Sequence, residues 1–380
     1  MARKALGTDV FNMAIDRMAA LYREGHRIVV SFSAGKDSTC ALNICKIAAR
    51  ETGRLPVEVV LQEEEIAWPG TYEYAERVAK DPEVSFTWLV MQHPMVNIFN
   101  RQEPYWWVCD PLLKPEQWVR QPPPFAQFVK EKEISMMTVP WRFPPPEGKN
   151  LYAVIGLRVE ESRGRMYGIF SSGGYITKPN KFNVSSVRPI YDWKDTDVWK
   201  AIKDNGWDYN RCYDTLYAAG IRGKALRVGP PTMTVAGVGL LQKAAAAWPL
   251  WFRRVADRLP GVRVGAQFGL RAVTPSRRLG ETWEQCFQRE CIDRAPQWIA
   301  ERATLMRDRI LTTHSHHSTA PFPEKNACYT CVNHLGSWKN MAMAFYNGDP
   351  FSLKCSGQIP WVEPEFFRPG AGKWIVSPSM

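Results

Sequence analysis

The sequence has no run of about 18 consecutive apolar residues, the length that a helix needs to cross a bilayer. Its first 30 residues carry charges throughout and lack the apolar core of a signal peptide. The nine cysteines are an odd number scattered along the chain, which is not the pattern of a disulfide framework. A reducing compartment would keep them as thiols or metal ligands. These absences predict a cytoplasmic protein without a membrane partner.

Acidic residues are too few to balance the basic ones. Asp and Glu number 38 against 49 Lys and Arg, which gives a net charge of +11. Such an excess suits a polyanionic partner, either nucleic acid or a phosphorylated substrate. A solvated basic face would explain the same composition, so both interpretations stay open. The arginines concentrate after residue 220, at Arg253, Arg254, Arg258, Arg263, Arg271, Arg277 and Arg278.

The chain as a whole is 45% hydrophobic and 23% charged, which is typical of a globular chain with a sizeable core. Apolar spacing predicts helices over residues 9–24 and 38–50, and β-branched runs predict strands over 28–32 and 57–61. This order of helix, strand, glycine loop, helix and strand predicts an α/β fold with a parallel twisted sheet flanked by helices. Further strands are expected over 86–90 and 151–157, and further helices over 71–80 and 194–202.

Two regions are expected along the chain. Residues 1–225 form the nucleotide-binding α/β domain, with a proline-rich and aromatic insertion at 104–150 that is ordered but irregular. Residues 226–380 form a mainly helical C-terminal region. Its predicted helices cover 240–259, 281–291 and 296–312.

Residues 31–39, SFSAGKDST, join a predicted buried strand to a predicted helix. Such a loop directs backbone N–H groups and the positive helix end at one point, where phosphate charge is stabilised. Gly35 permits close approach to an anion, hydroxyls add donors, and Lys36 adds charge. The Walker spacing is absent, so the cradle is of another kind. The predicted phosphate contacts are Ser31, Ser33, Ala34, Gly35, Lys36, Asp37 and Ser38.

The loop resembles the S-G-G-x-D-S loop of PP-loop ATP pyrophosphatases and phosphoadenosine-phosphosulfate (PAPS) reductases, with Ala34 where glycine is usual. Residues 156–165, GLRVEESRGR, resemble the G-x-R-x-x-E-S-x-x-R segment of that superfamily. Residues 188–199, RPIYDWKDTDVW, resemble its P-[IL]-x-D-W-x-x-x-D-V-W stretch. Three motifs in family order imply the PP-loop fold and a bound adenine nucleotide, either ATP or a PAPS-like molecule.

The second motif supplies charged side chains. Arg158, Arg163 and Arg165 can clamp phosphate or sulfate oxygens, and Glu161 can hold an arginine in place. A surface salt bridge is the alternative for such a loop. Glu63, with Glu64 and Glu65, follows the second strand and either reaches the nucleotide or its metal, or forms a solvated acidic turn. The predicted nucleotide contacts therefore extend to Glu63, Gly156, Arg158, Glu161 and Ser162.

Segments at 105–112, 209–221, 226–231, 260–269 and 338–341 resemble the IbrA-type branch, whose members often have a ParB/sulfiredoxin-like protein partner. The Glu-Cys-Gly-x-His segment of PAPS reductases and the cysteine pairs of adenylylsulfate reductases are missing. The resemblance therefore implies cleavage of ATP at the α–β bond, with an acceptor adenylylated and pyrophosphate released. Asp37 would orient the loop or a Mg²⁺ ion. The predicted catalytic residues are Lys36, Asp37, Arg158 and Arg165.

Three functions stay open. The first is an ATP-cleaving enzyme, acting in nucleic-acid modification or phage-related defence. The second is a nucleotide-sensing regulatory subunit of a ParB/sulfiredoxin-like protein. The third is sulfonucleotide reduction with an unconventional nucleophile such as Cys109 or Cys212.

A cysteine pair lies near the C-terminus. Cys328 and Cys331 have the two-residue gap that lets both thiolates meet one ion, and His334 and Cys355 follow as third and fourth candidate ligands. His314, His316 and His317 offer further donors. The open alternatives are zinc, an iron–sulfur cluster as in DndC-type DNA phosphorothioation enzymes, and buried thiols without metal.

Overall fold

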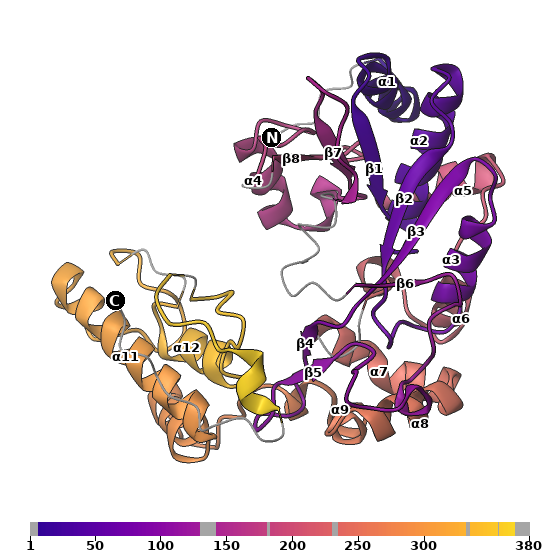
Figure 1. Cartoon of the computed structure of the whole chain (residues 1–380). Helices are drawn as coiled ribbons and strands as arrows, with labels where there is room; N and C mark the ends of the chain where they lie inside the picture. The colour runs from indigo at the N-terminus through magenta and orange to yellow at the C-terminus, as the bar shows by residue number, and fades with distance from the viewer. Residues whose placement is uncertain are drawn as a thin grey trace. The chain divides into compact units, whose positions relative to one another are not determined.

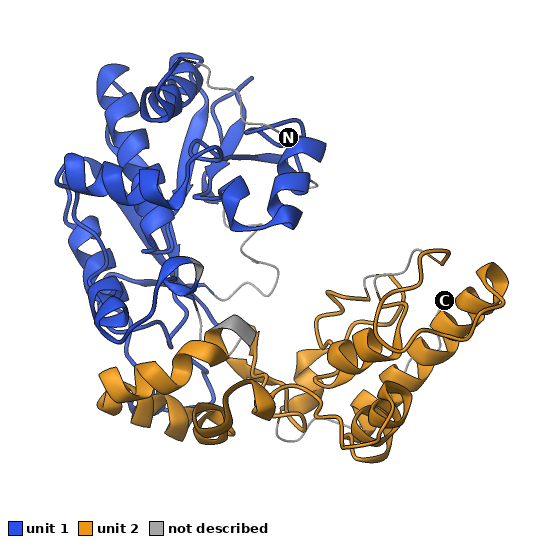
Figure 2. Ribbon diagram, turned by 180° about the vertical axis from the view of Figure 1, so that it is seen from behind, with its two compact units in different colours: residues 1–93, 108–230 blue, residues 94–107, 231–380 orange. Residues whose placement is uncertain are grey.

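The computed structural model of the chain describes residues 7–129, 142–180, 183–229, 235–331, 335–355 and 357–368. These residues form two compact units, shown in Figure 2. Unit 1 comprises residues 1–93 and 108–230, and unit 2 comprises residues 94–107 and 231–380. The division near residue 230 lies slightly beyond the 225/226 boundary expected from the sequence.

Unit 1 is built on a six-stranded sheet in the order β6-β3-β2-β1-β7-β8, and all its strand pairs are parallel. Buried β-branched residues form its centre, because a parallel sheet is covered on both faces. Helices flank the sheet (Figure 1), so the predicted fold class is confirmed. The strands are β1 (Arg27–Ser31), β2 (Val57–Gln62), β3 (Val84–Met91), β6 (Gln127–Val129), β7 (Leu151–Val154) and β8 (Val184–Val187). The helices are α1 (Val10–Arg23), α2 (Lys36–Glu51), α3 (Thr71–Ala79), α4 (Arg163–Ser171), α5 (Asp195–Asp204) and α6 (Cys212–Ala218).

The insertion predicted to be irregular contributes a strand to the sheet. β6 pairs in parallel with the end of β3, and the chain leading to it is fixed by a buried carboxylate. Glu65 accepts hydrogen bonds from the backbone N–H groups of Cys109 and Val119, at 2.6 and 3.0 Å. β8 was not expected either, because its sequence VSSV is too short and polar for a pattern to show.

Residues 94–107 belong to unit 2 although unit 1 surrounds them in sequence. β4 (Pro94–Val96) and β5 (Tyr105–Trp107) form an antiparallel ribbon. Tyr105 and Trp107 pack in one cluster with Trp298 and Ile299, which explains the assignment. Burial of aromatic surface, and not sequence proximity, decides where this ribbon lies.

The described remainder of unit 2 is mainly helical, as expected. The predicted helix over 240–259 is two helices, because Pro249 begins a new helix and cannot donate a backbone hydrogen bond within the old one. The helices are α7 (Val235–Ala247), α8 (Pro249–Arg258), α9 (Val262–Phe268), α10 (Trp283–Phe287), a π-helical turn (Gln288–Asp293), α11 (Gln297–His317) and α12 (Trp338–Phe345). Among the described residues, short 3₁₀ turns are Pro115–Gln117, Val159–Glu161, Gly223–Ala225, Gly269–Ala272 and Pro364–Phe367.

A buried arginine fixes the C-terminal segment of unit 2. Arg302 is 1% exposed, and its guanidinium donates to the carbonyl oxygens of Gly348, Asp349 and Pro360.

Within the described parts of the chain, no helix combines the length and the apolar character needed to cross a membrane.

Candidate nucleotide-binding site

The phosphate loop, residues 31–39, turns from the end of β1 into the first turn of α2. Ala34 has a φ of +54°, the left-handed conformation in which glycine is favoured. The Ser38 hydroxyl donates to the Gly35 carbonyl at 3.0 Å and lies 3.2 Å from the Ser33 hydroxyl. The first turn of α2 and two serine hydroxyls therefore converge at one point, as phosphate binding requires.

Two residues near α6 hold this loop in place. Asn210 is fully buried, and its side-chain amide donates to the Ala34 carbonyl at 3.1 Å and to the Thr71 hydroxyl at 3.0 Å. The backbone N–H of Lys36 donates to the Tyr213 hydroxyl at 3.0 Å. No sequence motif pointed to Asn210 or Tyr213 as supports of the loop, although both lie in the segment 209–221.

Gly156 packs directly against the loop. A Cβ atom at this position would lie 2.6 Å from the carbonyl carbon of Asp37 and 2.6 Å from the backbone nitrogen of Ser38. Only glycine lets the chain after β7 approach the first turn of α2 this closely. Gly156 therefore lies in direct contact with the loop, and its predicted contact with a nucleotide stays a prediction.

Lys36, Asp37 and Arg158 come together beside the loop. Both cations are nearly buried, at 5% and 3% exposed. The Arg158 Nε lies 2.6 Å from one oxygen of Asp37, and the Lys36 Nζ lies 3.1 Å from the other. Asp195, at the start of α5, lies 3.1 Å from Lys36 and 3.2 Å from Arg158. Asp195 belongs to the third motif, residues 188–199, and completes this charge network.

Glu160 extends the network to the backbone of α5. Its carboxylate lies 3.5 Å from Arg158 and accepts the N–H of Asp195 at 2.7 Å. Three carboxylates thus surround two cations, so Lys36 and Arg158 are held in fixed orientations before any ligand is present.

Arg165 and Glu161 form an ion pair one helical turn apart at the start of α4. The Ser162 hydroxyl accepts the N–H of Arg165 and caps that helix. Burial lowers the pKa of Arg165, and the nearby charges of Arg227 and Arg158 act in the same direction. Arg227 is a further cation near the site, which the sequence analysis had not selected.

The three consecutive glutamates after β2 have different surroundings. Glu63 is fully buried, and its two oxygens accept hydrogen bonds from the Trp88 indole and the Glu65 backbone. Glu63 and Glu65 thus both have structural contacts, unlike residues of a solvated turn. Burial, together with the charge of Glu63, raises the pKa of Glu64 to about 7.

Three of the candidate metal ligands of unit 2 lie close together. The ligand atoms of His314, Cys328 and Cys331 all lie within 4.8 Å of one another. Cys355 is not in that group: it lies in the hydrophobic core, and burial raises the pKa of its thiol to about 12. His334 lies outside the described residues. Hydrogen bonding to Thr330 lowers the pKa of Cys328 to about 6.

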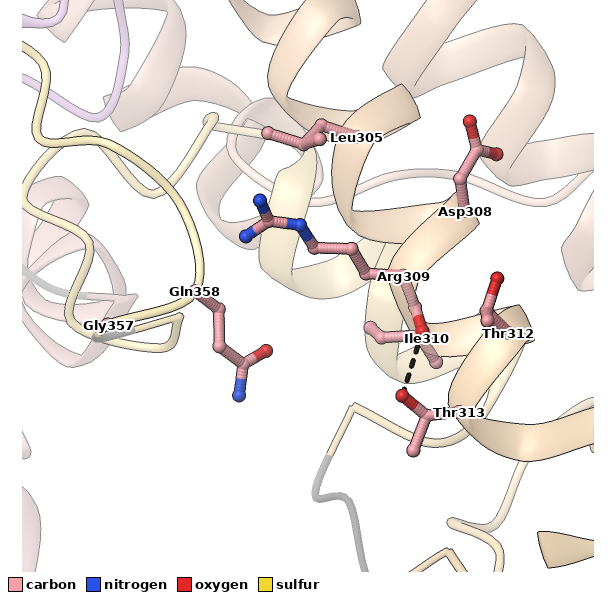
Figure 3. A pocket seen from close by; sticks show the side chains of 8 residues that line it. All are labelled: Leu305, Asp308, Arg309, Ile310, Thr312, Thr313, Gly357 and Gln358. Carbon is pink, nitrogen blue, oxygen red and sulfur yellow. Dashed lines mark hydrogen bonds between the residues drawn. The ribbon is translucent and has the colours of Figure 1, made fainter. Parts of the chain in front are cut away.

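A hollow of about 610 Å³ also lies in unit 2 (Figure 3). It is lined mainly by one side of α11, with Gln358 opposite, and its charged groups are Asp308 and Arg309. The Thr313 hydroxyl donates to the Arg309 carbonyl at 2.9 Å, so this hydroxyl is engaged by the backbone of its own helix. The hollow has no concentration of anion-binding groups like that around residues 31–39.

The fold is an α/β sheet with a loop that contains serine and glycine at the carboxyl end of β1, before the first turn of α2. The chain matches the model of the phosphoadenosine phosphosulfate reductase domain over residues 27–222, more than half its length. It belongs to that family, within the PP-loop superfamily.

A curated relative is the uncharacterized protein YbdN of Escherichia coli K12, 25% identical over 254 residues. The match covers 60% of this chain and 59% of YbdN. Solved structures with similarity include FMN adenylyltransferase of Candida glabrata with FAD and pyrophosphate, at 12% identity and a TM-score of 0.35, covering 56% of this chain and 63% of that one. PAPS reductase of Candida auris, in a phosphate complex, has 10% identity and a TM-score of 0.29, covering 58% and 95%.

Proposed function

We propose that unit 1 binds ATP at the phosphate loop and cleaves its α–β bond. The observation that carries this proposal is the convergence of the first turn of α2 and the Ser33 and Ser38 hydroxyls beside the buried cations Lys36 and Arg158. An acceptor atom would bond to the α-phosphorus while the bridging oxygen leaves with pyrophosphate, and a hydroxyl acceptor would release its proton to solvent. The chemistry needs positioning and charge stabilisation, without a protein nucleophile.

The contacts suggest a separate role in ATP binding or cleavage for each of these residues. The loop from Ser33 to Ser38 would hold the β- and γ-phosphates, and Arg165 would neutralise charge that develops during transfer. Asp37 has both oxygens engaged by Lys36 and Arg158, so it would orient those cations. Mg²⁺ would arrive with the phosphates, and the Asp195 side chain, 42% exposed, is the carboxylate best placed to meet it.

Sulfonucleotide reduction is the weaker candidate because the chemistry of the cysteines is unfavourable. Cys109 and Cys212 are both buried. Burial raises the pKa of Cys212 to about 12, so it remains a thiol at neutral pH and is a poor nucleophile. Membership of the family still allows a PAPS-like nucleotide in the same cradle.

The proposal extends to an acceptor and a protein partner. Nucleic acid is one acceptor that suits the basic chain, although part of that charge is compensated locally: Arg253 and Arg263 both pair with Asp257. A sensing subunit of a ParB/sulfiredoxin-like protein of the IbrA-type branch would use the same cradle without cleavage.

Two lysines on α2 provide a matched test. Lys36 pairs with Asp37 and Asp195, and Lys46 pairs with Asp81 and Glu83 at the other end of the helix. Lys36→Met should weaken ATP binding about 10- to 100-fold, the value of one charge-assisted contact of about 1.5–3 kcal/mol. Lys46→Met should leave the affinity unchanged. Titration calorimetry with ATP and with PAPS measures both variants.

Pyrophosphate release, measured with candidate acceptors, tests cleavage separately. ATP binding that Lys36→Met abolishes, without pyrophosphate from any acceptor, would favour the sensing function. Equal ATP affinity in wild type and Lys36→Met would refute the cradle itself. Tight PAPS binding with sulfite release would support sulfonucleotide reduction instead.

A further inference from the structure

A histidine and two cysteines meet at the end of α11 in unit 2. His314 lies in the last turn of this helix, and Cys328 and Cys331 lie in the loop that precedes α12. Their ligand atoms all lie within 4.8 Å of one another. Tetrahedral zinc, with Zn–S of about 2.3 Å and Zn–N of about 2.0–2.1 Å, places such atoms about 3.5–3.8 Å apart. Small side-chain rotations would close the difference.

The buried imidazole gives an independent indication of a ligand. His314 is 5% exposed, and its Nε2 lies 2.9 Å from the Ala320 carbonyl oxygen. A carbonyl only accepts, so Nε2 carries the hydrogen and Nδ1 presents a lone pair. That Nδ1 is buried and has no hydrogen-bond partner among the described residues. An unsatisfied buried acceptor is unfavourable, and a metal ion would satisfy it.

This is the arrangement that orients metal-binding histidines in proteins, where the nitrogen opposite the metal donates to a carbonyl or carboxylate. The cysteine loop is also held on both sides. The Cys328 N–H donates to the Gly336 carbonyl at 3.0 Å, and the Trp338 N–H donates to the Pro323 carbonyl at 2.9 Å. The Phe322 ring contacts both the His314 and Trp338 rings edge-on, with centroids 5.2 and 5.3 Å away.

We propose that His314, Cys328 and Cys331 bind a Zn²⁺ ion that joins the end of α11 to the loop before α12. Two thiolates and one imidazole are donors that zinc favours, and the fourth position would be taken by water or another donor. Both cysteines would bind the ion as thiolates. An iron–sulfur cluster is disfavoured, because such clusters are mostly held by four cysteines and Cys355 lies in the core.

The test uses the full-length chain purified without added metal. Mass spectrometry of the metal content should find about one zinc per chain. A mercurial reagent that modifies the thiols should release that zinc in proportion to the cysteines modified, a readout that needs no variant. Cys328→Ser, Cys331→Ser and His314→Ala should each lower zinc affinity at least tenfold, as loss of a ligand does.

His317→Ala is the matched control, since His317 lies in the same last turn with its Nδ1 2.8 Å from the Thr313 carbonyl. It should retain the zinc of the wild type. Far-UV circular dichroism shows whether each variant is folded. Zinc content unchanged in all three ligand variants, a wild-type chain that binds no added zinc, or inorganic sulfide and iron after anaerobic purification would each overturn the proposal.

Discussion

The substitution Gly156→Ala tests how the second motif supports the phosphate loop. The added methyl would lie 2.6 Å from backbone atoms of Asp37 and Ser38, against about 3.4 Å for an ordinary contact. Neither neighbour is a flexible side-chain end, so the first turn of α2 must move away from β7 by several tenths of an ångström. Overpacking of this kind costs about 1–3 kcal/mol.

The loss should appear in both stability and binding. Urea unfolding followed by fluorescence measures the free energy of unfolding, and calorimetry measures ATP affinity. We expect an affinity loss of at least tenfold, because the shift would move the loop N–H groups and the Ser38 hydroxyl so that they no longer point at the same phosphate. Gly168→Ala on α4 is the control: nothing lies within 4 Å of its Cβ position, and it should stabilise the helix by about 0.5–1 kcal/mol. Gly156→Ala with wild-type stability and affinity would refute the close approach.

Three further predictions concern the loop and its surroundings. Ala34→Gly should raise the free energy of unfolding by about 0.5–1 kcal/mol in urea unfolding, because alanine is held at a φ of +54°; a loss of stability would contradict the strain. Arg158→Lys should lower the free energy of unfolding by about 1–3 kcal/mol and ATP affinity about tenfold, because an ammonium cannot span Asp37 and Asp195 as a guanidinium does. If both the free energy of unfolding and the ATP affinity stay unchanged, Arg158 does not hold the charge network together. The raised pKa of Glu64 means that the folded state binds its proton more tightly than the unfolded chain. Stability should therefore fall by about 3 kcal/mol as the pH rises from 4.5 to about 7, and Glu64→Gln should remove that fall in pH-dependent unfolding.

The sequence was sufficient for the features that local pattern controls. The predicted strand over 57–61 and helix over 38–50 correspond to β2 and α2, because burial and spacing fixed both. The polar strand β8 and the ribbon at 94–107 were missed, since their places depend on partners distant in the chain. Asn210 could not be selected either: one buried amide that binds the Ala34 carbonyl leaves no periodic signal.

The charge network explains why this cradle would depend on more than its lysine. Lys36 and Arg158 are surrounded by Asp37, Asp195 and Glu160, so two positive charges face three negative ones. Such a cluster has a net charge of −1 and does not attract a polyphosphate over distance, so its cations act through fixed geometry at close range. The attraction must then come from the loop N–H groups, from Arg165 near Arg227, and from the Mg²⁺ that accompanies ATP. The carboxylates hold the buried cations in fixed orientations, which is the preorganisation that phosphoryl-group transfer requires.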